Sequence, residues 1–354
     1  MISLQALRIY FKQHPHYFRH TGLATLKAFW WRLSGQKVAA VNATFGLGDY
    51  VWIRNYLYEL KRNGYKVVLM TNTRIPDFVE RLDSSTVDAL IPFFLDGKPM
   101  PDPPHRLDLI PFKFLCVDKY FDAGYGWGNF IRKSIHAKNT YGANIIGTDL
   151  VLFKEFDDLF RPAINISPEF AQKLPILPIA DKDRLAALEK PYVVLVEKGS
   201  QGRFSSDQIS AMLAHFIDKG FNIFYNGDYK ALCNSLPPQQ VANIIDGYRY
   251  PLHEYLYVVK HAQFMVTPNT GLYHFATQLD CPCVVTTLRE CLTLDLDNPI
   301  QRHLLDPKLN EAYHTRGIAN LWPYGFYDCD QTVFSVEQLL EAIKSLEAQL
   351  EAES

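Results

Sequence analysis

A polar turn follows the apolar run "QFMV" and contains residue types that hold phosphate groups. The stretch "TPNTGLYHFA", residues 267–276, supplies the candidates Asn269, Thr270, Gly271 and His274. Backbone N–H groups at the start of a helix favour the charge of an anion. The same stretch is compatible with an ordinary strand-to-helix connection in which Asn269 or Thr270 caps the helix. The turn alone leaves both interpretations open.

A second turn places two cations in a loop that contains glycine. In "VEKGSQGRFSS", residues 196–206, Lys198 and Arg203 lie between an apolar run and a helical pattern that begins with serine. Cations beside a helix N-terminus suit a phosphate or a diphosphate. A solvated surface loop has the same composition, so this stretch by itself does not decide between the two.

A third turn, "FGLGD", places the carboxylate of Asp49 after Gly46 and Gly48. Asp49 as the N-cap of the following helix is the structural interpretation. The NAD fingerprint is incomplete, because Val51 stands where a third glycine is required and the next strand ends in "MTNT" without an acid. The chain also lacks a Gly-x-x-x-x-Gly-Lys-Ser/Thr loop. The incomplete fingerprint therefore argues against a nicotinamide enzyme, and the missing loop excludes a P-loop NTPase.

Alternating strands and helices position these turns. Predicted strands are "KVAAVNAT", "KVVLMTN", "YVVLVEKGS", "FNIFYNGD", "QFMVTPN" and "PCVVTTL". Predicted helices include "YVWIRNYLYELKRNG", "SSDQISAMLAHFIDKG", "PPQQVANIID", "HEYLYVVKHA", "TGLYHFATQLD" and "SVEQLLEAIKSLEAQLEAE". This alternation predicts parallel sheets with right-handed crossovers, in which ligands bind at the carboxyl ends of strands. "FGLGD" and "TPNTG" lie at such ends, one in each half of the chain.

The length of 354 residues favours two domains over one core. We predict an α/β protein of two doubly wound, Rossmann-like domains that face a central cleft. The predicted segments are a basic, aromatic N-terminal extension at 1–36, a first domain at 37–165, a Pro-rich linker at 166–190, a second domain at 191–330 and a C-terminal helix at 331–354.

Composition excludes several classes of protein. The net charge of −2 argues against a nucleic-acid partner. The six cysteines lie in apolar stretches, and "CPC" at 281–283 has the wrong spacing for a metal knuckle, which predicts reduced thiols in a cytoplasmic protein. No apolar run approaches eighteen residues, and the N-terminus lacks the layout of a signal peptide. The triplets "DKD", "DLD" and "DCD" follow no confident strand, so we predict no metal site.

The first 40 residues differ from the rest of the chain because they contain no Asp or Glu. Their cations are Arg8, Lys12, Arg19, Lys27, Arg32 and Lys37. Their aromatic residues are Tyr10, Phe11, Tyr17, Phe18, Phe29, Trp30 and Trp31. A basic, aromatic helical segment can lie on an anionic membrane surface, here the inner membrane. An extra helix packed on the body, with aromatics in the core, is the other interpretation, and the sequence leaves both open.

These motifs together resemble the glycosyltransferase family that contains the ADP-heptose:lipopolysaccharide heptosyltransferases. "FGLGDYVWIRNYLYELKRNGYKVVLMTN" resembles its N-terminal motif, and "VVKHAQFMVTPNTGLYHFATQLDCPCVVTTL" resembles its C-terminal signature. "GRFS" at 202–205 is similar to its cationic loop. The matching stretches occur in the same order between about residues 37 and 325. Two positions depart from the family pattern, since Asn269 stands where Asp is usual and Phe204 where Trp is usual.

The resemblance implies the GT-B fold, inversion at the anomeric carbon and an active site without metal. It implies that the first domain holds the acceptor and the second the nucleotide-sugar donor, with Asp49 as the catalytic base. Arg203 would contact the donor diphosphate. Lys198 is a second candidate cation, from the composition of the loop and not from the resemblance. The nucleotide phosphates would lie at Asn269, Thr270, Gly271 and His274.

The chemistry of sugar transfer agrees with this assignment. An acceptor hydroxyl must lose a proton to a carboxylate as it attacks, and the leaving nucleoside diphosphate must meet preorganised donors. The sequence therefore predicts an inverting, metal-independent glycosyltransferase. It would move heptose or a related sugar from a nucleotide-diphosphate co-substrate, without a cofactor, to a lipopolysaccharide core or another cell-surface glycan or glycolipid. A sugar-nucleotide epimerase or hydrolase of the same fold, and a non-catalytic sugar-nucleotide or glycan-binding scaffold, remain open alternatives.

Overall fold

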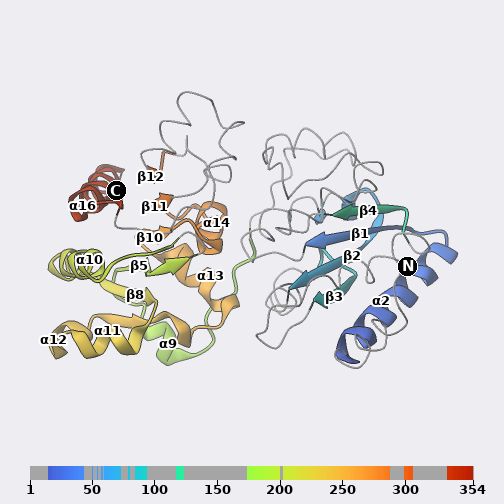
Figure 1. The fold of residues 1–354 in the computed structure, drawn as a ribbon, viewed down its shortest axis with the longest axis horizontal. Helices are drawn as coiled ribbons and strands as arrows, with labels where there is room; N and C mark the ends of the chain where they lie inside the picture. Colours follow the sequence, from blue (N-terminus) through green and yellow to red (C-terminus); the bar gives the residue numbers. More distant parts are fainter. Residues whose placement is uncertain are drawn as a thin grey trace. The chain divides into compact units, whose positions relative to one another are not determined.

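The computed structural model contains two compact units that divide between residues 172 and 173. It describes residues 15–43, 50, 54, 57–58, 60–72, 79, 84–93, 117–122, 174–199, 202–287, 299–305 and 333–353. Each unit contains a parallel β-sheet with helices (Figure 1). The predicted α/β class is confirmed.

The sheet of the first unit has four parallel strands in the order β3-β2-β1-β4. Their bounds are β1 Lys37–Ala43, β2 Tyr65–Asn72, β3 Ala89–Phe93 and β4 Lys119–Asp122. The central strands are lined by buried Val, Ala and Leu side chains, as expected for strands covered on both faces. Gly64 precedes β2 with a φ of 81°, a left-handed conformation that suits glycine, and it ends the preceding helix as predicted.

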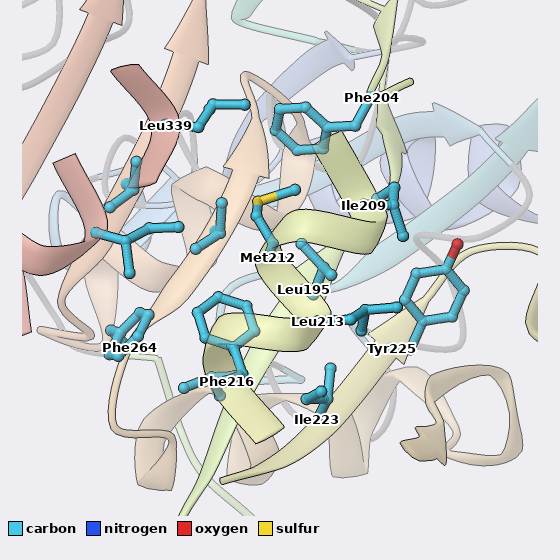
Figure 2. Packing of buried hydrophobic residues seen from close by; sticks show 14 of the residues in the cluster. Leu195, Phe204, Ile209, Met212, Leu213, Phe216, Ile223, Tyr225, Phe264 and Leu339 are labelled. Carbon is cyan, nitrogen blue, oxygen red and sulfur yellow. The ribbon is translucent and has the colours of Figure 1, made fainter. Parts of the chain in front are cut away.

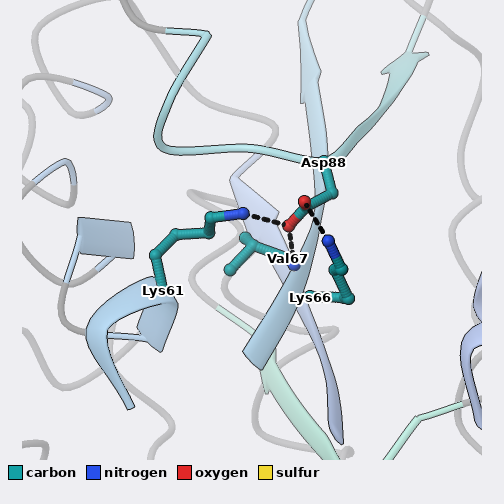
Figure 3. A network of polar contacts seen from close by, with 4 residues as sticks. All are labelled: Lys61, Lys66, Val67 and Asp88. Carbon is teal, nitrogen blue, oxygen red and sulfur yellow. Dashed lines mark hydrogen bonds and ion pairs between the residues drawn. The ribbon is translucent and has the colours of Figure 1, made fainter. Parts of the chain in front are cut away.

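The amino edge of this sheet is held by Asp88, which precedes β3 (Figure 3). Its carboxylate accepts hydrogen bonds from the Val67 backbone N–H at 2.8 Å, from Lys61 Nζ at 2.6 Å and from Lys66 Nζ at 3.2 Å. Burial opposes the charge of Asp88, but the bonds from Lys61, Val67 and Lys66 outweigh it, so its pKa is lowered. This carboxylate joins the starts of β2 and β3.

Helix α2, Pro15–Leu33, packs against β1, β2 and β3. The helix was expected from the sequence, and Pro15 begins it rather than interrupting it, in keeping with the tolerance of proline in a first helical turn. Its buried side chains include Ala24 and Ala28. Arg32 in its last turn pairs with Asp118 at 3.2 Å, and Asp118 also accepts from the Val38 backbone N–H at 2.7 Å.

The sheet of the second unit has six parallel strands in the order β12-β11-β10-β5-β8-β9. Every residue of β5, β10 and β11 is buried, which is typical of strands covered on both faces. The strand bounds are β5 Tyr192–Val196, β8 Asn222–Asn226, β9 Ile244–Asp246, β10 Met265–Pro268, β11 Cys283–Thr287 and β12 Gln301–Leu305.

The helices of this unit include those that the sequence predicted, and residues 182–186 and 229–235 form two further helices that it did not predict. The helix bounds are α9 Lys182–Ala186, α10 Ser206–Asp218, α11 Tyr229–Ser235, α12 Pro238–Val241, the 3-10 helix η3 Gly247–Arg249, α13 Leu252–His261, α14 Gly271–Gln278 and α16 Val336–Glu353. Helix α10 begins with a capping box between Ser205 and Gln208 and is followed by Gly220 at a φ of 80°, so its predicted cap and end are confirmed.

One helix prediction was too long. "PPQQVANIID" was predicted to be helical throughout, but α12 ends at Val241 and residues 244–246 form β9. Ile244 and Ile245 are β-branched and pair with Ile223 and Phe224 of β8. Pairing at the edge of the sheet therefore overrides the helical pattern in the second half of the segment.

A single apolar cluster holds α10 and α16 on one face of this sheet (Figure 2). Helix α10 contributes Met212 and Phe216, and α16 contributes Leu339. Phe216 meets Phe264 edge-to-face, with the ring centroids 5.8 Å apart. Phe264 directly precedes β10, so this packing fixes the central strands whose carboxyl ends carry the candidate site.

Candidate functional site

The cationic stretch after β5 forms a short hairpin. Strand β6, Lys198–Gly199, pairs antiparallel with β7, Gly202–Arg203, so that Lys198 lies opposite Arg203. The Phe204 backbone N–H donates to the Glu197 carbonyl at 3.0 Å, and the Phe204 ring is buried in the apolar cluster. The hairpin therefore carries both predicted cations to the carboxyl end of β5.

Glu197 at the base of this hairpin is a site residue that the sequence interpretation missed. Its side chain is 9% exposed, and one carboxylate oxygen pairs with Nε of Arg203. The other oxygen accepts from the Tyr225 hydroxyl and from the Asp228 backbone N–H, the latter at 2.8 Å. Burial, then the bond to Glu197, raises the pKa of Tyr225, which keeps its hydroxyl protonated as a donor. Glu197 thus holds Arg203 against the end of β8.

Glycine is required beside this carboxylate. A Cβ added at Gly227 would lie 2.1 Å from Oε2 of Glu197 and 2.6 Å from the Tyr225 hydroxyl oxygen. Any side chain there would displace the acid or the phenol. The sequence contained one signal of this site, the "GD" step after the apolar run "FNIFYN". A glycine directly after a predicted strand indicates that another group approaches the backbone closely there.

The two cations of the hairpin are in different electrostatic states. Arg203 is 55% exposed and its charge is partly balanced by Glu197. The side chain of Lys198 is exposed and forms no ion pair or hydrogen bond within the part of the chain that the structure describes. An incoming anion would therefore meet an uncompensated ammonium group beside a guanidinium group that is already oriented.

The turn after β10 follows the strand-to-helix pattern predicted for it. The Asn269 backbone N–H donates to the Thr286 carbonyl at 2.8 Å, which extends the pairing of β10 with β11, and its side chain is buried. Thr270 is the N-cap of α14, since its hydroxyl accepts from the Leu272 N–H at 3.1 Å. Of the N–H groups at 270–272 predicted to face a phosphate, that of Leu272 is therefore already engaged by the cap.

The hairpin and the turn lie against each other at Gly199. A Cβ added at Gly199 would lie 1.8 Å from Cγ2 of Thr270 and 3.4 Å from the Asn269 carbonyl oxygen. Only glycine allows this approach. The contact joins residues that are 71 positions apart (270 − 199). The structure therefore places two stretches at one edge of the sheet: Lys198 and Arg203 on one side, and Asn269, Thr270 and Gly271 on the other.

His274 lies in the first turns of α14 and is only 9% exposed. Burial lowers its pKa to about 4, so its imidazole is neutral at pH 7 and contributes no positive charge. Its ring meets that of Tyr273 edge-to-face at 5.2 Å. The Tyr273 hydroxyl donates to Oε1 of Gln301 at 2.8 Å, which ties α14 to β12. His274 can act as a neutral hydrogen-bonding group.

Further polar groups lie at the carboxyl end of β11. The hydroxyl oxygens of Thr286 and Thr287 are buried and have no hydrogen-bond partner among the described residues. Thr286 is in register with Pro268, directly before the turn. Buried polar atoms are usually satisfied, so two orphaned hydroxyls on adjacent residues mark this edge as one with unused hydrogen-bonding capacity.

The predicted catalytic residue cannot be placed in this geometry. Asp49, with Gly46 and Gly48, lies outside the described residues.

Of the three Asp-x-Asp triplets, the one that is described caps a helix, since the Asp181 carboxylate accepts from the Arg184 N–H at 3.0 Å. Among the residues that the structure describes, no group of three or more His, Cys, Asp or Glu is arranged to hold a metal ion. In the same residues, no helix combines the length and apolar character that a membrane span requires.

No family model and no curated protein sequence matches the chain. Solved structures do match its fold. ADP-heptose lipopolysaccharide heptosyltransferase II of E. coli aligns with a TM-score of 0.56 and 13% identity, over 89% of this chain and 99% of that one. A glycosyl transferase of family 9 from Veillonella parvula aligns with a TM-score of 0.53 and 13% identity, over 88% and 97%. The iron-containing heptosyltransferase TibC, solved in complex with ADP-D-beta-D-heptose, aligns at 0.55 and 14%, over 90% and 79%.

The chain has the fold of the heptosyltransferases. The predicted GT-B architecture is thereby confirmed, with one Rossmann-like sheet in each unit. At 13–14% identity the property shared with these enzymes is the fold.

Proposed function

We propose that the protein is a glycosyltransferase that takes a sugar from a nucleoside-diphosphate donor. One observation carries the proposal: the Lys198–Arg203 hairpin and the Thr270 cap of α14 converge at the carboxyl edge of the second sheet. That edge is where doubly wound sheets bind ligands. Two cations and a helix N-terminus are the groups that stabilise a diphosphate as it leaves.

The donor we propose is an ADP-sugar of the heptose type. TibC shares the fold and was solved with ADP-D-beta-D-heptose, which supports this class of donor. The donor would be a co-substrate, and no cofactor is needed. Lys198, Arg203 and the first turn of α14 would offset the charge that a divalent ion offsets elsewhere, and neutral His274 would supply a hydrogen bond. Transfer should therefore survive EDTA, and activity lost in EDTA and restored by Mg²⁺ or Mn²⁺ would contradict the metal-free proposal.

The acceptor we propose is a hydroxyl of a lipopolysaccharide core or another cell-surface glycan or glycolipid, attacked with inversion. Asp49 would take the proton from that hydroxyl. A helix N-terminus stabilises the carboxylate and lowers its basicity, so Asp49 acting only as an N-cap is the competing role. An acceptor anchored in lipid would place the enzyme on the cytoplasmic side of the inner membrane.

The deciding experiment measures release of the nucleoside diphosphate from a panel of donors, with and without a truncated lipopolysaccharide acceptor. A glycosyltransferase requires the acceptor, whereas a hydrolase or an epimerase consumes the donor alone. Asp49→Asn should lower turnover about 10²–10⁴-fold with unchanged donor affinity, because asparagine also caps helices but cannot accept the proton. Near-normal turnover, with an unchanged Tm, would leave Asp49 as a cap. Donor binding without any transfer or hydrolysis would favour the non-catalytic, sugar-nucleotide-binding scaffold.

A further inference from the structure

Helix α2 exposes large apolar side chains along the face that points away from its sheet. Trp30 is 68% exposed and Leu26 is 66% exposed. The full set, which we call the outer stripe of α2, is Leu23, Leu26, Phe29, Trp30 and Leu33, each at least 48% exposed. Isolated exposed apolar residues are ordinary, but a contiguous apolar patch marks an interaction surface.

The spacing of the outer stripe shows that it is a continuous band on one side of the helix. Leu23, Leu26, Trp30 and Leu33 follow each other at intervals of three, four and three residues, which at 3.6 residues per turn keeps them on one face. The buried Ala24 and Ala28 lie on the opposite side, against the sheet seen beside α2 in Figure 1. A surface helix normally buries its large apolar residues and exposes polar ones. In α2 the small residues are buried and the large ones are exposed.

The segment that carries the stripe has charges of one sign only. The first 40 residues hold six Lys or Arg and no acid. Lys27 is exposed within the helix, and its side chain has no ion pair or hydrogen bond with any residue that the structure describes. Arg32 is four residues after the buried Ala28 and is already paired with Asp118, so it belongs to the sheet side of α2. Apolar and aromatic side chains flanked by cations are the composition of helices that lie in the interface of an anionic bilayer.

This charge also argues against a second copy of the chain as the occupant. A symmetric dimer brings the same patch of both subunits together. Two copies of an acid-free segment would then place like charges opposite each other, and a contact of that kind is unfavourable. Anionic lipid supplies both the apolar layer for Trp30 and Leu26 and the negative headgroups for Lys27.

We propose that the outer stripe of α2 is a membrane-docking surface that inserts into the interface of an anionic bilayer, with Lys27 in contact with lipid phosphates. This proposal combines the two interpretations of the segment, a helix packed on the body and a helix on a membrane surface. The helix packs on the body through its alanines, and its large side chains contact lipid. The exposure and charge of α2 carry this proposal, and it stands whether or not the proposed sugar transfer is correct.

The test is vesicle co-sedimentation of the full chain, with phosphatidylcholine vesicles and with vesicles containing phosphatidylglycerol. The expected result is binding that requires phosphatidylglycerol and weakens as salt rises. The double variant Leu26→Gln/Trp30→Gln should bind at least tenfold more weakly, because it removes two large apolar groups from the interface. Lys27→Gln should reduce affinity about fivefold at low salt.

Tyr248→Gln is the matched control, since Tyr248 is 64% exposed but lies in the second unit. It should bind vesicles like the unchanged chain. The altered α2 positions are exposed, so both variants should keep the Tm of the parent, and the Tm is measured beside the binding. Equal binding by the double variant, or no binding to anionic vesicles by the parent, overturns the proposal. Self-association that the double variant abolishes, without lipid binding, also overturns it and assigns the stripe to a second copy.

Discussion

Asp88 and Glu197 are similar carboxylates at opposite ends of parallel strands. Each is largely buried, with 13% and 9% of its side chain exposed, and each accepts from a backbone N–H and holds at least one cation. Asp88 precedes β3 in the first unit, at the amino edge of its sheet. Glu197 follows β5 in the second unit, at the carboxyl edge.

The difference lies in what each carboxylate organises. Asp88 ties Lys61 and Lys66 to the start of β2, and the result is a closed structural joint. Glu197 orients Arg203, which is 55% exposed in a hairpin beside the start of α14. The ion pairs of Asp88, at the amino edge of one sheet, therefore stabilise the fold. The ion pair of Glu197, at the carboxyl edge of the other sheet, holds a cation that is exposed to solvent. The position at the carboxyl end of a strand, more than the residue types, therefore identifies Glu197 and Arg203 as the candidate functional pair.

The largest effect that tests this comparison is expected from Arg203→Ala. Loss of a charge-assisted contact of roughly 1.5–3 kcal/mol with the leaving diphosphate should lower kcat/KM about ten- to a hundredfold. Lys61→Ala, the matched removal of a cation from Asp88, should leave kcat/KM unchanged. Steady-state kinetics of both variants make the measurement. Equal kcat/KM for Arg203→Ala and the parent would mean that the ion pair of Glu197, like that of Asp88, is only structural.

A smaller effect is expected from Glu197→Gln. Glutamine can still accept from the Tyr225 hydroxyl and the Asp228 N–H, but it no longer pairs ionically with Arg203. The donor KM should rise roughly two- to tenfold, the range expected for one hydrogen-bonded interaction, while the acceptor KM stays constant. A purely structural role would instead lower the Tm without separating the two KM values. Tyr225→Phe, which removes only the bond that steadies Glu197, should change the donor KM in the same direction and by less.

The smallest effect on activity, and a distinct effect on stability, is expected from Asp88→Asn. The pKa of Asp88 is lowered on folding, so its contribution to stability is present above the unfolded pKa of about 3.9 and is lost as pH falls through the folded value. The parent should therefore be more stable than Asp88→Asn at pH 6, and the difference in Tm should shrink toward pH 3. Thermal melts across this range make the measurement, with kcat/KM at pH 7 expected to be unaltered. A difference in Tm that grows on acidification would have the wrong sign for a carboxylate stabilised in its charged form.

Much of the architecture was predictable because it depends on local patterns. Short β-rich runs and capped helices recur at the predicted places, and Ser205, Gly64 and Gly220 end or begin helices as expected. The turn at Thr270 was also predictable, since a Thr-Gly step after an apolar run is a local signal. These features need no knowledge of distant residues.

The missed features all depend on contacts between distant segments. Glu197 meets the hydroxyl of Tyr225, 28 residues away, and no spacing rule connects them. The neutral state of His274 follows from burial, which the sequence of α14 does not specify. β9 was predicted as helix because its edge pairing with β8 is tertiary. Which side chains of α2 are exposed was left open by the sequence for the same reason, since the sheet determines which side of a helix is covered.

The sheet order of the second unit also has a kinetic consequence. The hairpin extends from β5 and the capped turn from β10, and these strands are neighbours although Val194 and Met265, paired in register, are 71 positions apart (265 − 194). The segments that form β8 and β9 lie between them in the sequence and are placed on the other side of β5. Non-local parallel pairing has a high entropic cost of loop closure and forms slowly. During refolding, the capacity to bind a nucleoside diphosphate should appear only in the phase that joins β5 to β10, later than the local helical signal of α10 and α16.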